Sequence, residues 1–112
     1  MPELAPPKAS GAIRVATFNV SLNRSGPGLL TRDLLSGSNS QCQALAAVIR
    51  AVQPDILLLN EIDYSTESDN AGLFHEYYLA DSGTDLLGGS AWTMADRYSA
   101  EANTGLPSEL DL

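Results

Sequence analysis

Two segments of the chain carry the residue pattern of β-strands. In residues 12–22, AIRVATFNVSL, β-branched residues are frequent, and alternate positions make one face of the segment more apolar than the other. In residues 55–63, DILLLNEID, apolar residues follow one another without interruption, which is typical of a strand covered on both faces. The pattern predicts one strand in each segment.

A helix is predicted between the two strands. Four apolar residues fall at positions i, i+3, i+4 and i+7 of one helix face: Leu45, Val48, Ile49 and Val52. Ser38 or Ser40 is expected to cap the start of this helix, and Pro54 ends it because proline has no N–H to donate. Strands joined by a helical crossover lie parallel in one sheet. We therefore expect a strand–helix–strand unit and an α/β fold.

The remaining segments carry weaker patterns. Residues 1–10 are rich in proline and are expected to be a disordered lead-in to a domain of residues 11–112. Residues 29–35 are expected to form a short helical turn, and residues 73–80, LFHEYYLA, a second helix with its large side chains along one side. The glycine-rich residues 81–90 are expected to form a loop, without the glycine spacing of a phosphate-binding loop.

Several conspicuous residues are expected to serve packing. Cys42 is the only cysteine, so an internal disulfide is excluded, and its place in a helical pattern indicates a small core or boundary residue. Tyr77, Tyr78 and Trp92 are expected to anchor the core, since no basic residues interleave with them as they would on a base-stacking surface. The single histidine, His75, is expected to be a packing or surface residue of the same helix.

Composition narrows the class of protein. The chain has 112 residues, enough for one domain, and 44% of them are hydrophobic, as in a folded globular protein. With 14 Asp and Glu against 6 scattered Lys and Arg, the formal charge is -8, which does not support tight binding of a nucleic acid. The chain as given begins without a signal-peptide pattern and has no window apolar enough for a membrane span. We expect a soluble protein whose location is open.

Polar residues end both predicted strands. Asn19 lies at the C-terminal end of the first and Glu61 at that of the second, and the C-terminal ends of parallel strands meet at the edge where open α/β sheets bind ligands. A carboxylate beside an amide oxygen suits Mg²⁺, which prefers oxygen ligands and can activate a water. The alternatives are a solvated carboxylate at a strand end and an amide satisfied by the backbone. Alternation places Asp63 on the face of Glu61 and Asn60 on the other, and Asp63 also suits a turn or a cap.

Two motifs in these segments resemble those of a known family. Thr17-Phe18-Asn19 fits the motif T-[FWY]-N, and the segment from Pro54 to Glu61, PDILLLNE, fits P-D-[IV]-[IVL]-x-L-x-E. In this order and approximate spacing they resemble the N-terminal end of the endonuclease/exonuclease/phosphatase superfamily, which has the deoxyribonuclease-I-like fold. The segments SLNRSGPGLL, NEIDY and NTGLPSELDL further resemble a bacterial branch of that superfamily.

The resemblance implies a fold, a metal and a reaction. The fold would be the N-terminal part of a two-sheet α/β sandwich flanked by helices. Glu61 would bind the catalytic Mg²⁺ (or Mn²⁺), and Asn19 would help to hold the metal and the phosphate network. The reaction would be hydrolysis of a phosphoester by metal-activated water, in a nuclease or a phosphatase whose substrate the resemblance does not identify.

The other catalytic motifs of the family have no counterpart in the chain. Family members carry a D-x-N motif and, further along a longer domain, a His paired with an Asp, the His being the general base. His75 comes too early in this order and lacks the flanking pattern. The chain is therefore expected to be an N-terminal part that is inactive by itself. The alternative is a non-catalytic small α/β binding module or a truncated remnant.

Overall fold

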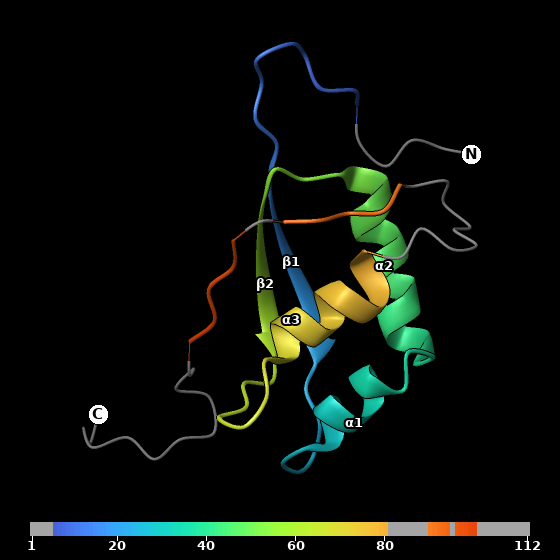
Figure 1. The fold of residues 1–112 in the computed structure, drawn as a ribbon. Coiled ribbons are helices and arrows are strands. Elements are labelled where there is room, and N and C mark those ends of the chain that lie inside the picture. The colour runs from blue at the N-terminus through green and yellow to red at the C-terminus, as the bar shows by residue number, and fades with distance from the viewer. Residues whose placement is uncertain (1–5, 81–89, 95, 101–112) are drawn as a thin grey trace.

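The structure, a computed structural model, describes residues 6–80, 90–94 and 96–100. Its elements in chain order are β1 (Val15–Leu22), α1 (Leu29–Leu35), α2 (Ser40–Val52), β2 (Ile56–Ile62), α3 (Asn70–Phe74) and the π-helix η1 (His75–Leu79). The expected α/β class is confirmed, with strand, helix and strand followed by a further helix (Figure 1). Most of the expected loop of residues 81–90 and the segment NTGLPSELDL lie outside the described residues.

The two strands pair in parallel, as the crossover predicts. Val15 lies opposite Ile56, and the register continues without a shift to Asn19 opposite Asn60. Pairing then becomes irregular and resumes with Leu22 opposite Ile62. Helix α2 makes the crossover between the strands, so the C-terminal ends of β1 and β2 lie at the same edge of the sheet (Figure 1).

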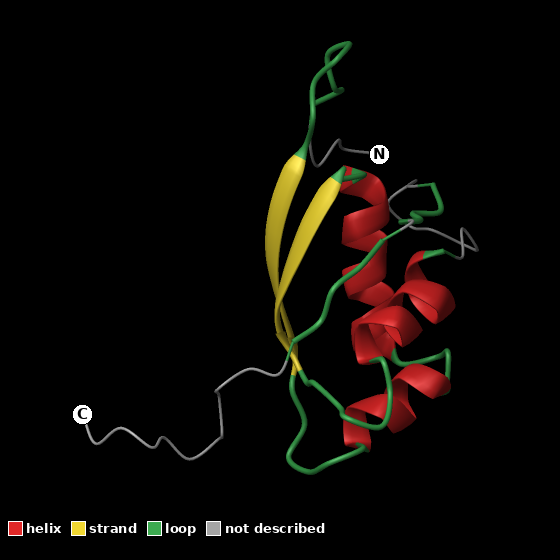
Figure 2. Ribbon diagram, turned by 60° about the vertical axis from the view of Figure 1, so that its left-hand side comes forward, coloured by secondary structure: helices red, strands yellow, loops and turns green. Residues whose placement is uncertain are grey.

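The helices lie on one side of the sheet, and the core lies between them and that face (Figure 2). Its buried apolar residues, each at most 7% exposed, are Val20, Leu22, Leu30, Leu34, Cys42, Ala46, Ile49, Phe74, Tyr78, Leu79 and Trp92. Cys42 and Trp92 are therefore core residues, as predicted. The indole N–H of Trp92 donates to the Pro54 carbonyl at 2.8 Å, which satisfies the polar atom of the buried ring.

The other face of the sheet, called here the open face, is exposed in the part of the chain that the structure describes. The exposed fractions are 65% for Val15, 55% for Ile56 and 56% for Leu58. The prediction that the second strand is covered on both faces is therefore wrong for the part of the chain that the structure describes. The described helices all lie on the opposite face (Figure 2). Side chains alternate along β2, so Ile56 and Leu58 point away from the core.

Helix α2 begins one residue away from either predicted cap. The side chain of Asn39 accepts the backbone N–H of Cys42 at 3.0 Å, so Asn39 is the N-cap in place of Ser38 or Ser40. The helix ends at Val52, before Pro54, as predicted. Its buried face is centred on small residues, Cys42 and Ala46, together with Ile49. Of the four residues predicted for that face, Ile49 is buried, and the other three are half-buried.

The helix predicted at residues 73–80 starts at Asn70 and changes its winding at His75. Asp69 caps it by accepting the Gly72 N–H at 3.0 Å. The π-helical turn places Tyr78 in the core while Tyr77 is 39% exposed, so the prediction that both tyrosines anchor the core is wrong for Tyr77. A π-turn takes an extra residue, which breaks the spacing on which the prediction was based.

The hydroxyl group of Tyr78 joins α1 to α2. It accepts the backbone N–H of Asn39 at 3.2 Å and donates to the carbonyl of Asp33 at 3.0 Å. His75, one turn earlier, accepts the N–H of Met94 at its Nε2 atom (3.3 Å). The side chains of His75 and Tyr78 in η1 thus both have structural contacts. Among the described residues, no helix is long and apolar enough to cross a membrane.

Candidate functional site at the C-terminal edge of the strands

The structure brings together Asn19 and Glu61, which are 42 positions apart in the sequence. The side-chain Nδ2 group of Asn19 donates a hydrogen bond to Oε2 of Glu61. Asn19 stands near the end of β1 and Glu61 near the end of β2, so the contact lies at the C-terminal edge of the pair (Figure 1). Both residues are exposed, so the Glu61 carboxylate is open to solvent beside an oriented amide.

A β-bulge shapes this edge. Between the pairs Asn19–Asn60 and Leu22–Ile62, β1 contains two residues and β2 only Glu61. The backbone is left-handed on both sides of the bulge, with φ of 50° at Ser21 and 59° at Glu61. A left-handed conformation costs a residue with a Cβ atom about 1–2 kcal/mol. The regular alternation predicted for β2 ends here, and Asn60 and Glu61 are exposed in succession.

Both the oxygen and the nitrogen of the Asn19 side-chain amide make hydrogen bonds at the bulge. Its Oδ1 accepts the backbone N–H of Ser21 at 3.1 Å and lies 3.3 Å from the Ser21 hydroxyl. Its Nδ2 group faces Glu61. The two contacts fix the orientation of the amide, because the Ser21 N–H needs an acceptor and the carboxylate needs a donor. Asn19 therefore positions the carboxylate with its nitrogen, while its oxygen is engaged by the backbone.

Asp63 has a structural role, in keeping with the turn or cap that the sequence analysis gave as its alternative. Its carboxylate accepts the Asn23 side-chain amide at 3.0 Å and the Arg24 backbone N–H at 2.8 Å. Its own N–H donates to the Leu22 carbonyl at 3.0 Å. The signal was an aspartate directly after a strand and before a polar segment, which suits a cap or a turn. Asp63 thus holds the start of the loop after β1.

The same loop is tied to the helices through Arg24. Its Nε donates to Asp33 of α1 at 2.9 Å and its Nη2 to Gln41 of α2 at 3.0 Å. The hydrogen bond from Arg24 holds the pKa of Asp33 below its usual value. Gln41 in turn donates to the Ser21 carbonyl at 2.9 Å. Side chains from both helices therefore support the bulged edge.

A second aspartate fastens the opposite end of the strands. Asp55, directly before β2, accepts the backbone N–H of Arg14 at 2.7 Å and the ammonium group of Lys8 at 2.9 Å. The Arg14 N–H, followed by the Lys8 ammonium, lowers the pKa of Asp55. Asp55 and Asp63 thus flank β2 and bind the residues that flank β1. We call these contacts the Asp55 clamp and the Asp63 clamp.

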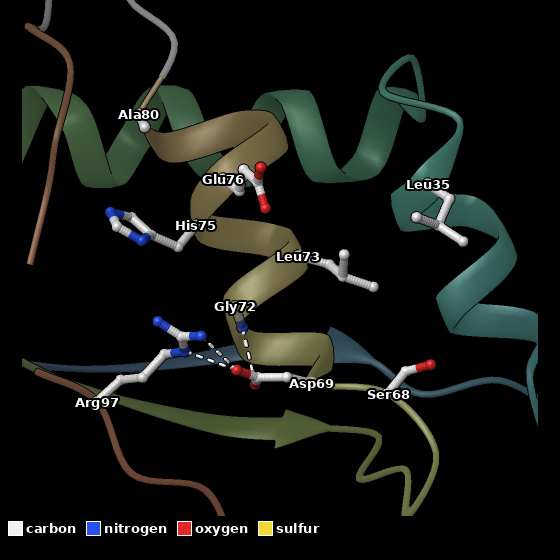
Figure 3. Close-up of a pocket in the computed structure, with 9 residues that line it drawn as sticks. All are labelled: Leu35, Ser68, Asp69, Gly72, Leu73, His75, Glu76, Ala80 and Arg97. Carbon is white, nitrogen blue, oxygen red and sulfur yellow. Dashed lines mark hydrogen bonds and ion pairs between the residues drawn. The ribbon is translucent and has the colours of Figure 1, made fainter.

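Two surface hollows lie near α3. The smaller, of about 520 Å³, is lined by Leu35, Ser68, Asp69, Gly72, Leu73, His75, Glu76, Ala80 and Arg97 (Figure 3). Asp69 is engaged there by the Gly72 N–H at 3.0 Å and by Arg97 at 2.6 Å, and these contacts lower its pKa. A larger hollow of about 910 Å³ follows β2 and includes Glu61. The site edge therefore opens into the larger hollow.

Few of the described side chains at this edge could bind a metal ion. Among the described residues there is no group of three or more His, Cys, Asp and Glu side chains that could hold a metal ion. Asp63 is engaged by Asn23 and Arg24, so Glu61 carries the open carboxylate of the edge. Comparison with protein-family models, with curated proteins and with solved structures finds no match for the chain.

Proposed function

We propose that Asn19 and Glu61 form part of a Mg²⁺-dependent site for phosphoester hydrolysis, of the kind found in the endonuclease/exonuclease/phosphatase superfamily. The observation that supports this proposal is the exposed Glu61 carboxylate, oriented by Asn19 at the C-terminal edge of two parallel strands. A single carboxylate fits Mg²⁺, or Mn²⁺ in its place, because Mg²⁺ commonly binds through one or two carboxylates and keeps several waters. When bound, the metal would polarise a phosphoryl oxygen and activate a water.

The two residues have different roles in this proposal. Glu61 is the metal ligand. Asn19 helps to hold the metal through Glu61, since its Nδ2 group donates to the carboxylate and its Oδ1 accepts the Ser21 N–H. Such a donor fixes the direction of the ligand and leaves the other carboxylate oxygen for the cation. The hollow along β2 offers space for the phosphoester beside Glu61.

The open face of the sheet supports the finer fold assignment. In a two-sheet α/β sandwich a second sheet would cover Val15, Ile56 and Leu58, which are more than half exposed here. We propose that the chain is the N-terminal part of such a sandwich. The general base would come from the remainder of the domain, so the chain by itself would not turn over a substrate.

The metal is tested by thermal unfolding of the chain with increasing MgCl₂. A ligand that binds only the folded state at ten times its Kd stabilises it by about 1.4 kcal/mol, so the melting temperature should rise with MgCl₂. Glu61→Gln should abolish the rise, because the glutamine side chain has no charge with which to bind Mg²⁺. Its amide oxygen can still accept the hydrogen bond from Asn19, so this contact is retained. Glu76→Gln, which removes one charge from η1, is the control and should respond like the unchanged chain. An equal response with and without Glu61 would refute the metal site.

The alternative is a non-catalytic binding module. One observation favours it, namely that the Nε2 atom of His75 accepts the Met94 N–H and the ring lies edge-on to Trp92 at 6.0 Å, so this histidine is engaged in packing. A chain that binds no Mg²⁺ and remains folded would support this function over a metal-dependent one. A rise in melting temperature with MgCl₂ that is lost in Glu61→Gln would favour the metal-dependent function over it.

A further inference from the structure

Glu61 has a conformation that requires support from its surroundings. Its φ of 59° is unfavourable for a residue with a Cβ atom, and the side chain is exposed, so burial of the side chain does not hold it. Strained backbone persists only where neighbouring structure fixes it from both sides. On the N-terminal side this is the regular ladder up to Asn60. The support on the C-terminal side must come from the residues that follow.

The C-terminal support is concentrated in Asp63. Its N–H donates to the Leu22 carbonyl at 3.0 Å, and its carboxylate accepts from Asn23 at 3.0 Å and from the Arg24 N–H at 2.8 Å. One residue thus binds three consecutive residues of the other chain segment. Pairing resumes with Leu22 opposite Ile62, one position after Glu61, and the contacts of Asp63 fasten this resumed pairing from its C-terminal side.

Asp63 is itself held from the helical side. The Asn70 side chain donates to the Asp63 carbonyl at 2.9 Å, and Asn70 is only 5% exposed. The hydroxyl of Thr31 in α1 donates to Asn70 Oδ1 at 2.7 Å. The position of Asp63 is therefore set by α1 and α3 together, in addition to its contacts with β1.

We infer that Asp63 is a positioning residue, which keeps the Glu61 carboxylate against Asn19 by closing the strands beyond the bulge. It acts through the backbone of Glu61, and both of its carboxylate oxygens accept hydrogen bonds from the loop after β1. The functional meaning of this role rests on the proposed metal site. The structural role stands on the hydrogen bonds and can be measured without metal.

The test is the NMR signal of the Asn19 side-chain amide in the ¹⁵N-labelled, metal-free chain. Glu61→Ala gives the reference position of this signal without its acceptor. Asp63→Asn, which cannot accept both hydrogen bonds as a carboxylate does, should move the signal toward that reference. Asp55→Asn is the matched control: it weakens the Asp55 clamp at the other end of the same strands and should leave the signal in place. An unmoved signal in a folded Asp63→Asn chain overturns the inference.

A second variant covers the case in which Asp63→Asn does not fold. Asn23→Ala removes one hydrogen bond of the Asp63 clamp and leaves the Arg24 N–H in contact with the carboxylate. It should move the Asn19 signal in the same direction by a smaller amount, and no movement overturns the inference.

A separate measurement links the positioning role to the metal. Asp63→Asn should weaken Mg²⁺ binding about 10–100-fold, as loss of a group that orients a ligand does. If the unchanged chain binds no Mg²⁺, the proposed function fails while the amide signal still decides the role of Asp63. If Mg²⁺ binds equally well in Asp63→Asn, the positioning role is refuted and the metal site stands.

Discussion

Replacing Glu61 by glycine should leave the protein more stable than replacing it by alanine. The backbone of Glu61 has a φ of 59°, in the left-handed region that glycine adopts without a steric penalty. A residue with a Cβ atom loses about 1–2 kcal/mol in this region. Both replacements remove the carboxylate and its contact with Asn19, so that loss cancels when the two variants are compared.

The expected size follows from two opposing terms. Glycine avoids the left-handed penalty but loses more chain entropy on folding, which costs about 0.5–1 kcal/mol relative to alanine. The net difference should be about 0.5–1 kcal/mol in favour of glycine. For a domain of this size 1 kcal/mol corresponds to about 4–8 °C, so Glu61→Gly should melt about 2–8 °C above Glu61→Ala.

The assay is thermal unfolding followed by far-UV circular dichroism, with urea unfolding as a second measure. Asn60 provides the control, since it is exposed in the same strand and its φ is not positive. At Asn60 the order should reverse, with glycine less stable than alanine by about 0.5–1 kcal/mol. If Glu61→Gly is no more stable than Glu61→Ala, the strain at Glu61 is absent in solution.

Three further predictions concern the core, the open face and the pH dependence. Leu34→Ala should cost about 2–5 kcal/mol because Leu34 is fully buried, whereas Leu58→Ala on the open face should cost less than about 1 kcal/mol; urea unfolding compares them. Trp92→Phe should cost about 1–3 kcal/mol by leaving a buried carbonyl without its donor, again measured in urea. The lowered pKa of Asp55 adds stability that is complete above its unfolded pKa of about 3.9 and is lost as the pH falls through its folded pKa. The free energy of unfolding of Asp55→Asn should therefore fall less steeply with pH in this acid range, as measured by urea unfolding at a series of pH values.

The sequence predicts the unit that brings the site residues together. Pro54 ends the crossover helix, and the apolar run that begins at Ile56 is too short for a second long helix, so strand, helix and strand follow from local chemistry. Parallel pairing then places the ends of both strands at one edge. Because of this topology, the proximity of Asn19 and Glu61 could be expected from residues that are far apart in the chain.

The bulge and the clamps could not be predicted in the same way. No glycine marks Ser21 or Glu61 as left-handed, because the conformation is imposed by the contacts on either side. The partners of Asp63 are a loop amide and a loop N–H, whose positions depend on how Arg24 reaches the two helices. An apolar run has the same appearance whether one or both faces of its strand are covered, so the run alone does not reveal that Ile56 and Leu58 are exposed.

The hydroxyl of Tyr78 has a consequence for the order of folding. It binds Asp33 and Asn39, which are 45 and 39 positions away and which stand on either side of the short link between α1 and α2. The link joins residues that are close in sequence. Two of its hydrogen bonds, however, are made by η1, which lies much further along the chain. The crossover unit can therefore collapse early, but the link between its first two helices becomes fixed only when η1 docks. Amide exchange at Asn39 should report that final step.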